Sequence, residues 1–353
     1  MTSSLESHAA LEFVLTLRRR WADTLYPQLR KECDALGAPQ PSATEGFADR
    51  VHSLRSYQGF AWLERGSQKM LWRAALDAIA EDEAAAACAA DSGPTGPGPT
   101  LELDPRLPLP DWYTAWDIHL QPGGVWSDAT SARVYELGAR LVMLGDNDDY
   151  KFHRLFVETA IPPRDYRRIV DLGCGFGKST WPLKKAHPHA EVIGIDLAAP
   201  CLELAASRAA TRELDIRFRQ ADAARTGLEP ARADLVTATM LIHELPLEEL
   251  AAVFAEAERL LASGGLLRIL DFQYTGDRLR DLAMTEHGAR NNEPFMPPMM
   301  SADTAAMAEA AGLRNARWTA FDECGAGRLA ALTWPQRPEW HFPWAVLEAE
   351  KLA

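Results

Sequence analysis

Residues 168–177 read Arg-Ile-Val-Asp-Leu-Gly-Cys-Gly-Phe-Gly, and this stretch decides the predicted fold. An apolar run with a single acid, Asp171, leads into three glycines on alternate positions, and Lys178 then opens a helical stretch. Glycine lets the backbone turn sharply and lets a ligand approach bare main chain. Free N–H groups at the start of a helix favour polar or anionic ligand groups. The stretch therefore predicts a buried strand, a tight turn and a ligand site at a helix N-terminus.

Two common phosphate-binding patterns do not fit this turn. A P-loop requires Gly-x-x-x-x-Gly-Lys-Ser/Thr, and counting back from Gly177 places Leu172 where the first glycine belongs. A dinucleotide fingerprint requires Gly-x-Gly-x-x-Gly, which Gly173 and Gly175 satisfy but Lys178 does not. The spacing that remains is Asp-x-Gly-x-Gly-x-Gly.

Acidic and polar residues also follow the later apolar segments. Asp196 ends the apolar segment 190–195, where a carboxylate can accept hydrogen bonds from ribose hydroxyls. Strand-like alternation at 216–219 precedes Asp222, and the apolar segment 233–242 precedes His243 and Glu244. A helix is expected at 246–262 and another buried strand at 266–272. Strands alternating with helices predict a doubly wound α/β fold, with ligands at the carboxyl ends of the strands.

The pattern from Asp171 to Gly177 resembles motif I of the class I S-adenosylmethionine (SAM) dependent methyltransferases. Five segments match this family in order and spacing over about residues 150–335. The resemblance implies a Rossmann-like, mostly parallel seven-stranded sheet and SAM as the cofactor, with Leu197 against the adenine and Asp222 accepting from its amino group. The cofactor-binding residues that it implies are Asp171, Gly173, Cys174, Gly175, Asp196, Leu197, Asp222, Ala223 and Thr239.

Composition narrows the class of protein. The 353 residues allow about two domains, and the formal net charge of −13 argues against a nucleic acid partner. No basic region followed by an apolar core begins the sequence, and no apolar run approaches the ~20 residues that span a bilayer. Five scattered cysteines indicate reduced thiols, a cytoplasmic location and no metal site. Cys174 is interpreted as a small packing residue.

Residues 1–145 are predicted to form a mostly helical domain for substrate binding or dimerisation, with a flexible loop near 81–100. Residues 146–353 are the predicted SAM-binding domain. The aromatic segment 111–126 either lines a ligand pocket, through Tyr113, Trp116 and His119, or packs between the helices and the sheet and holds them together. Residues 274–300, with His287 and Arg290, form either a lid over the acceptor or a packing loop. The domain is predicted to end with a helix over 301–311, capped by Ser301, and with paired strands at 315–321 and 328–333. The tail, which contains tryptophans, either packs on this domain or makes a homodimer contact.

His243 and Glu244 are the predicted catalytic residues. Methyl transfer needs an aligned acceptor and, for a hydroxyl, a base, and histidine can act as a base near neutral pH. The segment Leu-Ile-His-Glu-Leu resembles that of small-molecule O-methyltransferases that use this histidine as the base; the other interpretation is that His243 only shapes the pocket. The leading hypothesis is a small-molecule O-methyltransferase. The alternatives are a SAM cyclase that releases methylthioadenosine, a non-catalytic SAM-binding module and, less favoured by Lys178 and Asp222, an NAD oxidoreductase.

Overall fold

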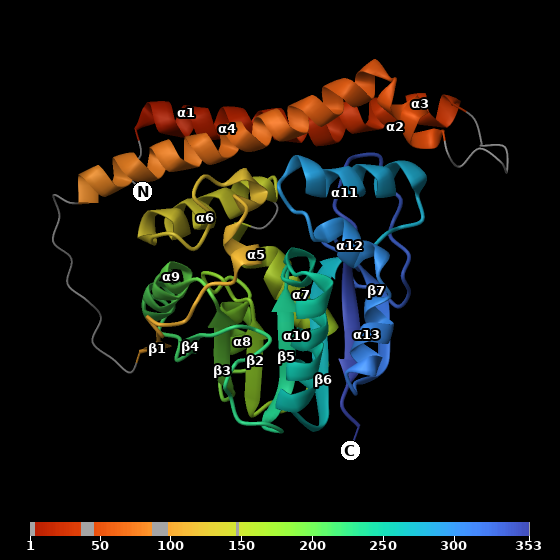
Figure 1. The fold of residues 1–353 in the computed structure, drawn as a ribbon. Coiled ribbons are helices and arrows are strands. Elements are labelled where there is room, and N and C mark those ends of the chain that lie inside the picture. Colours follow the sequence, from red (N-terminus) through yellow and green to blue (C-terminus); the bar gives the residue numbers. More distant parts are fainter. Residues whose placement is uncertain (1–3, 37–45, 87–97, 146–147, 353) are drawn as a thin grey trace.

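A computed structural model describes residues 4–36, 46–86, 98–145 and 148–352. In these residues, a twisted sheet lies beneath a layer of helices (Figure 1). The strands in the order of the sheet are β1 (Thr100–Glu102), β4 (Arg217–Gln220), β3 (Glu191–Asp196), β2 (Arg168–Leu172), β5 (Ala233–Thr239), β6 (Leu261–Phe272), β9 (Trp344–Glu350), β7 (Arg314–Asp322) and β8 (Gly327–Arg328).

The sheet confirms the predicted fold class. Strands β1 to β6 pair in parallel, whereas β9, β7 and β8 pair antiparallel. Seven strands from β4 to β7 form the body of the sheet, and the two- and three-residue strands β8 and β1 extend its edges. From β2 the chain runs outward through β3 and β4, and it returns to the other side of β2 with β5 and β6. This reversal between β2 and β5 is the point where doubly wound sheets bind ligands.

Helices connect the parallel strands and supply the apolar faces that cover the sheet. They are α8 (Thr180–Ala186), α9 (Ala199–Ala210), α10 (Leu247–Leu260) and the short η4 (Ile242–Glu244). In α10, the residues Leu250, Phe254 and Ala257 are fully buried, at the three- and four-residue spacing of one helix face. The side chains that follow β2, β3 and β5 are thereby held at one edge of the sheet.

The helical layer comes from the first part of the chain, as predicted. It comprises α1 (Leu5–Arg20), the π-helical turn η1 (Trp21–Leu25), α2 (Tyr26–Ala35), α3 (Phe47–His52) and α4 (Arg55–Ala86). Trp21 stacks on Phe60 at 4.7 Å between ring centroids and shares one hydrophobic core with the sheet residues Ile169 and Leu235. The division into domains at residue 145 stays a prediction. Residues 81–86 continue α4 and are therefore not a loop; residues 87–97 of the predicted loop lie outside the described residues.

The segment between the helical layer and the sheet contains α5 (Asp111–Thr114), η2 (Ile118–Leu120), α6 (Ala129–Val142), η3 (Asp148–Tyr150) and α7 (Lys151–Ala160). Side chains from 111–126 contribute to cavities and also contact the helices. His119 and Leu120 have left-handed backbone angles, with φ of 56° and 64°, which are uncommon for non-glycine residues. The carbonyl of His119 accepts hydrogen bonds from Trp72 Nε1 at 2.5 Å and Gln68 Nε2 at 3.2 Å on α4. This segment therefore joins α4 to the edge of the sheet.

The last third of the chain differs from the sequence prediction in three respects. Residues 274–300 are largely helical, as α11 (Arg278–Arg290) and α12 (Met296–Ser301). Asp303, not Ser301, caps α13 (Thr304–Ala310) by accepting from the amide of Ala306 at 2.9 Å. The predicted pairing of β7 with the segment that begins at Arg328 is confirmed only for the short strand β8, because residues 329–333 form no strand. On its other side, β7 pairs with β9 from the tail, which lies between β6 and β7.

Among the described residues, no helix is both long and apolar enough to cross a membrane. The cytoplasmic location and the homodimer stay predictions.

Candidate active site

The glycine turn after β2 has the tight conformation predicted for it. Gly173, Gly175 and Gly177 have φ of 66°, 51° and 90°, in the left-handed region that favours glycine. A Cβ atom on Gly173 would lie 2.7 Å from the side chain of Leu241, so a larger residue there would require Leu241 to move. The amide of Gly175 donates to Oδ2 of Asp196 at 2.7 Å and so couples the turn to the end of β3.

Asp171 lies beneath this turn and is fully buried. Its buried carboxylate accepts hydrogen bonds from Ser179 Oγ at 2.6 Å, Thr180 Oγ1 at 2.7 Å and Thr237 Oγ1 at 3.0 Å. Burial raises the pKa of Asp171, and these three hydrogen bonds oppose the increase. The residue fixes β2, β5 and the start of α8 relative to one another, and it thereby supports the turn from below.

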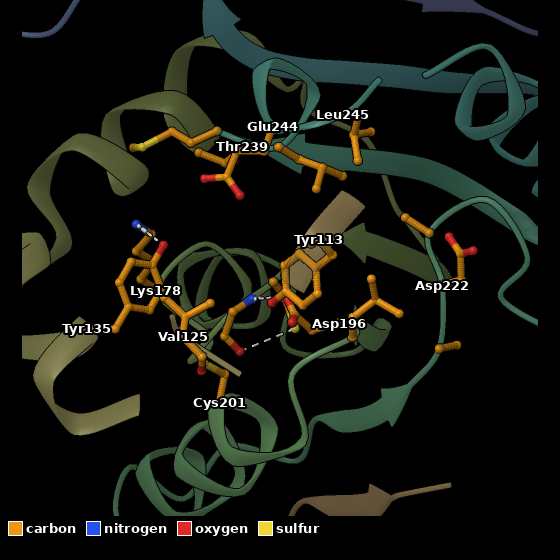
Figure 2. A pocket seen from close by; sticks show the side chains of 18 of the residues that line it. Tyr113, Val125, Tyr135, Lys178, Asp196, Cys201, Asp222, Thr239, Glu244 and Leu245 are labelled. Carbon is orange, nitrogen blue, oxygen red and sulfur yellow. Dashed lines mark hydrogen bonds between the residues drawn. The ribbon is translucent and has the colours of Figure 1, made fainter. Parts of the chain in front are cut away.

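A first cavity of about 770 Å³ lies beside the turn (Figure 2). Of the predicted cofactor-binding residues, all except Asp171 line it: Gly173, Cys174, Gly175, Asp196, Leu197, Asp222, Ala223 and Thr239. The predicted residues Tyr113 and Glu244 also line it. Residues that the sequence analysis did not assign as ligand-binding complete the wall: Trp112, Val125, Tyr135, Lys178, Cys201, Ala221, Met240, Leu241 and Leu245.

Two carboxylates of the first cavity already accept hydrogen bonds from backbone amides. Oδ1 of Asp196 accepts from the amide of Ala198 at 2.8 Å, and Oδ1 of Asp222 accepts from the amide of Ala224 at 2.8 Å. Burial raises the pKa of Asp196 to about 6, while its hydrogen bonds act in the other direction. The hydroxyl of Thr239 is buried and makes no hydrogen bond within the described part of the chain. A bound ligand can supply the partner that this hydroxyl lacks.

A second cavity of about 650 Å³ lies between the helical layer and the edge of the sheet. It shares four lining residues with the first cavity, Tyr135, Lys178, Met240 and Glu244, which we call the junction. Met240 has a left-handed φ of 55°, a strained conformation of the kind often found at functional sites. The other lining residues come from α4, α6 and more distant segments: Gln68, Trp72, His119, Ala139, Val142, Met143, His243, Phe272, His287, Glu293, Phe342 and Trp344.

Lys178 is the partly buried cation of the junction. Its Nζ lies 3.4 Å from the hydroxyl of Tyr135 and 5.6 Å from the ring centroid of Phe176. Figure 2 shows Lys178 directed at the Tyr135 hydroxyl. Burial lowers the pKa of Lys178 to about 8, although the charge of Glu244 acts to raise it. The two cavities therefore meet at a cation, a carboxylate and a phenol.

His243 lies in the wall of the second cavity, and its orientation is fixed by Asp271 at the end of β6. Nδ1 of His243 lies 2.7 Å from Oδ1 of Asp271, which is fully buried. Because a carboxylate only accepts hydrogen bonds, Nδ1 carries the proton and Nε2 keeps a free electron pair in the neutral ring. Burial acts to lower the pKa of His243, but Asp271, together with the charges of Glu244 and Glu293, outweighs it, so the pKa lies above its ordinary value of 6.5. This pairing suits a general base.

His119 joins two carboxylates of the second cavity. Its Nε2 lies 3.1 Å from Oε1 of Glu244, and its Nδ1 lies 2.8 Å from Oε1 of Glu293. Burial acts to lower the pKa of His119, but both carboxylates outweigh it and raise the pKa to about 10. Burial acts to raise the pKa of Glu293, but His119 and the neighbouring histidines lower it to about 2. The three groups therefore form a charged cluster near neutral pH.

The remaining predicted substrate residues fall into different places. His287 lines the second cavity, where its Nε2 lies 3.8 Å from Oε1 of Glu293. Arg290 is paired with the buried Glu64 on α4 and lines neither of the two cavities. Trp116 is 46% exposed and also lines neither. The structure thus brings His119 and His287 to His243 and leaves Trp116 and Arg290 outside.

Sequence reasoning missed three charged residues of this site. Asp271 follows the criterion that identified Asp196, an acid at the end of a buried strand, and could have been found by it. Lys178 directly follows the glycine turn. No local sequence pattern indicated Glu293, because its partner His119 lies 174 residues away in the chain.

The comparisons with known proteins identify the class of this site. Residues 169–265 match the family model described as "Methyltransferase domain". The demethylmenaquinone methyltransferase of Thermus thermophilus is 36% identical over 138 residues, which are 39% of this chain and 60% of that enzyme. The chain therefore contains a SAM-dependent methyltransferase domain with class I homologues, and SAM is its cofactor.

Two further proteins are similar to parts of the chain. The trans-aconitate 2-methyltransferase of Methylobacterium nodulans is 36% identical over 102 residues, covering 29% of this chain and 37% of that enzyme. A solved structure of phosphoethanolamine N-methyltransferase 2 from Haemonchus contortus covers 64% of this chain and 58% of its own, with 15% identity and a TM-score of 0.47. The chain spans less than two thirds of the length of the curated relatives named here.

The first cavity fits SAM in its chemistry. Asp196 and Asp222 offer carboxylate oxygens of the kind that hold ribose hydroxyls and an adenine amino group. Gly175 offers bare main chain, and Thr239 offers its unpaired hydroxyl. The acids Asp196 and Glu244 also suit the positive sulfonium, since opposite charges attract strongly in a buried site.

Proposed function

We propose that this chain is a SAM-dependent methyltransferase that methylates a hydroxyl oxygen of a small molecule, with His243 as the general base. The observation that carries the proposal is the pairing of His243 with Asp271 beside a second cavity that joins the cofactor cavity at the junction. A SAM cyclase needs no second cavity for an acceptor. The second cavity therefore supports a separate acceptor.

The proposed roles follow from the protein groups. Asp271 holds the His243 ring with Nδ1 protonated, so that Nε2 can take the proton of the acceptor hydroxyl as its oxygen becomes nucleophilic. SAM, when bound, supplies an electrophilic methyl group. Glu244 at the junction lies 3.9 Å from His243 Nε2 and stabilises the imidazolium that results. The walls of the second cavity exclude bulk water and hold the acceptor in position.

The N-terminal helical part is proposed to build much of the acceptor site. Gln68 and Trp72 on α4, together with Ala139 and Val142 on α6, line the second cavity without lining the first. The relatives named above act, by their names, on demethylmenaquinone and on trans-aconitate, so their acceptors differ from each other. The part of the chain outside the matched residues 169–265 is where we expect acceptor preference to be set.

The test is a His243→Gln variant assayed with SAM and a naphthol or dihydroxynaphthalene panel. Turnover, measured as S-adenosylhomocysteine and methylated product by mass spectrometry, should fall by about 100-fold or more. SAM affinity should change by less than about threefold, because His243 does not line the first cavity. The exposed His189→Gln is the matched control and should keep full activity. Release of methylthioadenosine from SAM alone by the wild-type protein would instead show a cyclase.

A further inference from the structure

Aromatic rings form much of the apolar part of the second cavity, beside Ala139, Val142, Met143 and Met240. Phe272 stacks on Trp344 with ring centroids 4.4 Å apart and an interplanar angle of 27°, and Phe342 lies 5.6 Å from Trp344. Trp72 adds a fourth ring from α4. The ring of His243 lies 4.9 Å from Phe272, so the base is held against this aromatic cluster. Such walls accommodate a flat apolar body.

The polar lining offers hydrogen-bond acceptors at Glu244, Glu293 and His243, and donors at Lys178 and Tyr135 of the junction. His119 occupies Oε1 of both Glu244 and Glu293, and within the described residues Oε2 of neither carboxylate has a hydrogen-bond partner. Nε2 of neutral His243 is a third acceptor. Ionised carboxylates cannot donate, so hydrogen bonds at these atoms require hydroxyl or amino hydrogens on the ligand.

The charges around the cavity are balanced. Glu244 and Glu293 oppose a ligand that carries a carboxylate, whereas the His119 imidazolium and the Lys178 ammonium oppose a ligand that carries a cation. Burying a charge without a partner is strongly unfavourable. The arrangement therefore favours a ligand that is uncharged and rich in donors.

We propose that the acceptor is an uncharged, flat aromatic molecule with at least two hydroxyl groups, one directed to His243 and another to Glu293. This inference rests on the proposed function, because it takes the second cavity to be the acceptor site. It adds a specificity-determining residue, Glu293, which lies outside the matched methyltransferase residues 169–265.

The test measures ligand binding by calorimetry on the full chain with S-adenosylhomocysteine present. The probes are a naphthol, the dihydroxynaphthalene isomers, a hydroxynaphthoic acid and an aminonaphthol. The best dihydroxynaphthalene should bind about tenfold or more tightly than the naphthol, as one hydrogen bond to a charged acceptor predicts. The hydroxynaphthoic acid should bind more weakly than the naphthol. In Glu293→Gln, the preference for the second hydroxyl should fall to about threefold or less.

Glu286→Gln is the matched control. Glu286 bonds to His52 on α3, to Tyr57 on α4 and to Arg290, and it does not line the second cavity, so its replacement should leave the preference unchanged. Binding of S-adenosylhomocysteine checks that each variant is folded, and the wild-type panel decides the ligand class even where a variant does not fold.

Two results separate this inference from the proposed function. Equal affinities for the naphthol and the dihydroxynaphthalenes, or a preference for the acid or the amine, would overturn the inference. Tight binding of a dihydroxynaphthalene that yields no methylated product with SAM would support the inferred ligand class and overturn the proposed O-methylation.

Discussion

Replacing Asp271 with asparagine tests the assigned base without removing it. The Asp271 carboxylate accepts from Nδ1 of His243 at 2.7 Å, the amide of Ile242 at 3.0 Å and the amide of Phe272 at 2.8 Å. An asparagine has one oxygen and one NH₂ group for these three positions, so at least one donor meets another donor. If the NH₂ group faces His243, the ring must place its proton on Nε2 and loses the free electron pair that the reaction needs.

The size of the effect follows from these contacts. Loss of general base catalysis reduces kcat by about 10²- to 10⁴-fold. If the oxygen faces His243 instead, the unpaired amide of Ile242 lowers the free energy of unfolding by about 1–3 kcal/mol. In both arrangements the pKa of His243 falls, because the Asp271 charge that raises it is gone. Since the base must be neutral to act, the rise of activity with pH should lie above pH 6.5 in the wild type and at lower pH in Asp271→Asn.

The assay is kcat against pH with the best acceptor of the naphthol panel, together with SAM affinity by calorimetry. SAM affinity should stay within about threefold, as Asp271 does not line the first cavity. Asp303→Asn is the control: Asp303 caps α13, and asparagine caps a helix about equally well. An Asp271→Asn enzyme with wild-type kcat and an unshifted pH profile would refute the assignment of His243 as the base.

Three further predictions concern the cofactor turn and the charged cluster. Gly173→Ala should lower the free energy of unfolding by about 1–2 kcal/mol in urea titrations, because φ is 66° and Leu241 occupies the space; unchanged stability would contradict this. SAM should raise the melting temperature of the wild type, and Asp196→Ala should abolish that increase, whereas NAD should have no effect on either. His119 has its pKa raised to about 10, so its stabilisation is complete below about pH 6.5 and is lost as pH rises toward 10. The melting temperature of His119→Gln should therefore fall less between pH 7 and 10 than that of the wild type, and parallel curves would contradict the ion-pair assignment.

The cofactor side of the site was largely predictable from the sequence. Asp196 and Thr239 lie at the ends of β3 and β5, and the glycine turn follows β2, so local strand patterns placed them at one edge of the sheet. Asp171 also came from this motif, but the sequence does not show that its carboxylate faces three hydroxyls beneath the turn.

The acceptor side could not be predicted in the same way. Glu293 meets His119, and Trp344 meets Phe272, only through contacts between segments far apart in the chain. The strand Trp344–Glu350 was missed because its apolar residues fit a packed tail equally well, and only the open position between β6 and β7 makes it a strand. Pairing over such distances depends on the assembled fold and not on local pattern.

The two cavities have largely separate sets of lining residues, and this has a consequence for how the protein can be altered. Apart from the four junction residues, the cofactor cavity and the acceptor cavity have no lining residue in common among the described residues. Replacement of Gln68, Val142 or Phe342 can therefore change the shape of the second cavity without changing the residues that line the first cavity. Such a separation makes the chain a suitable scaffold for directed evolution toward new acceptors, with libraries confined to the helical layer and the tail.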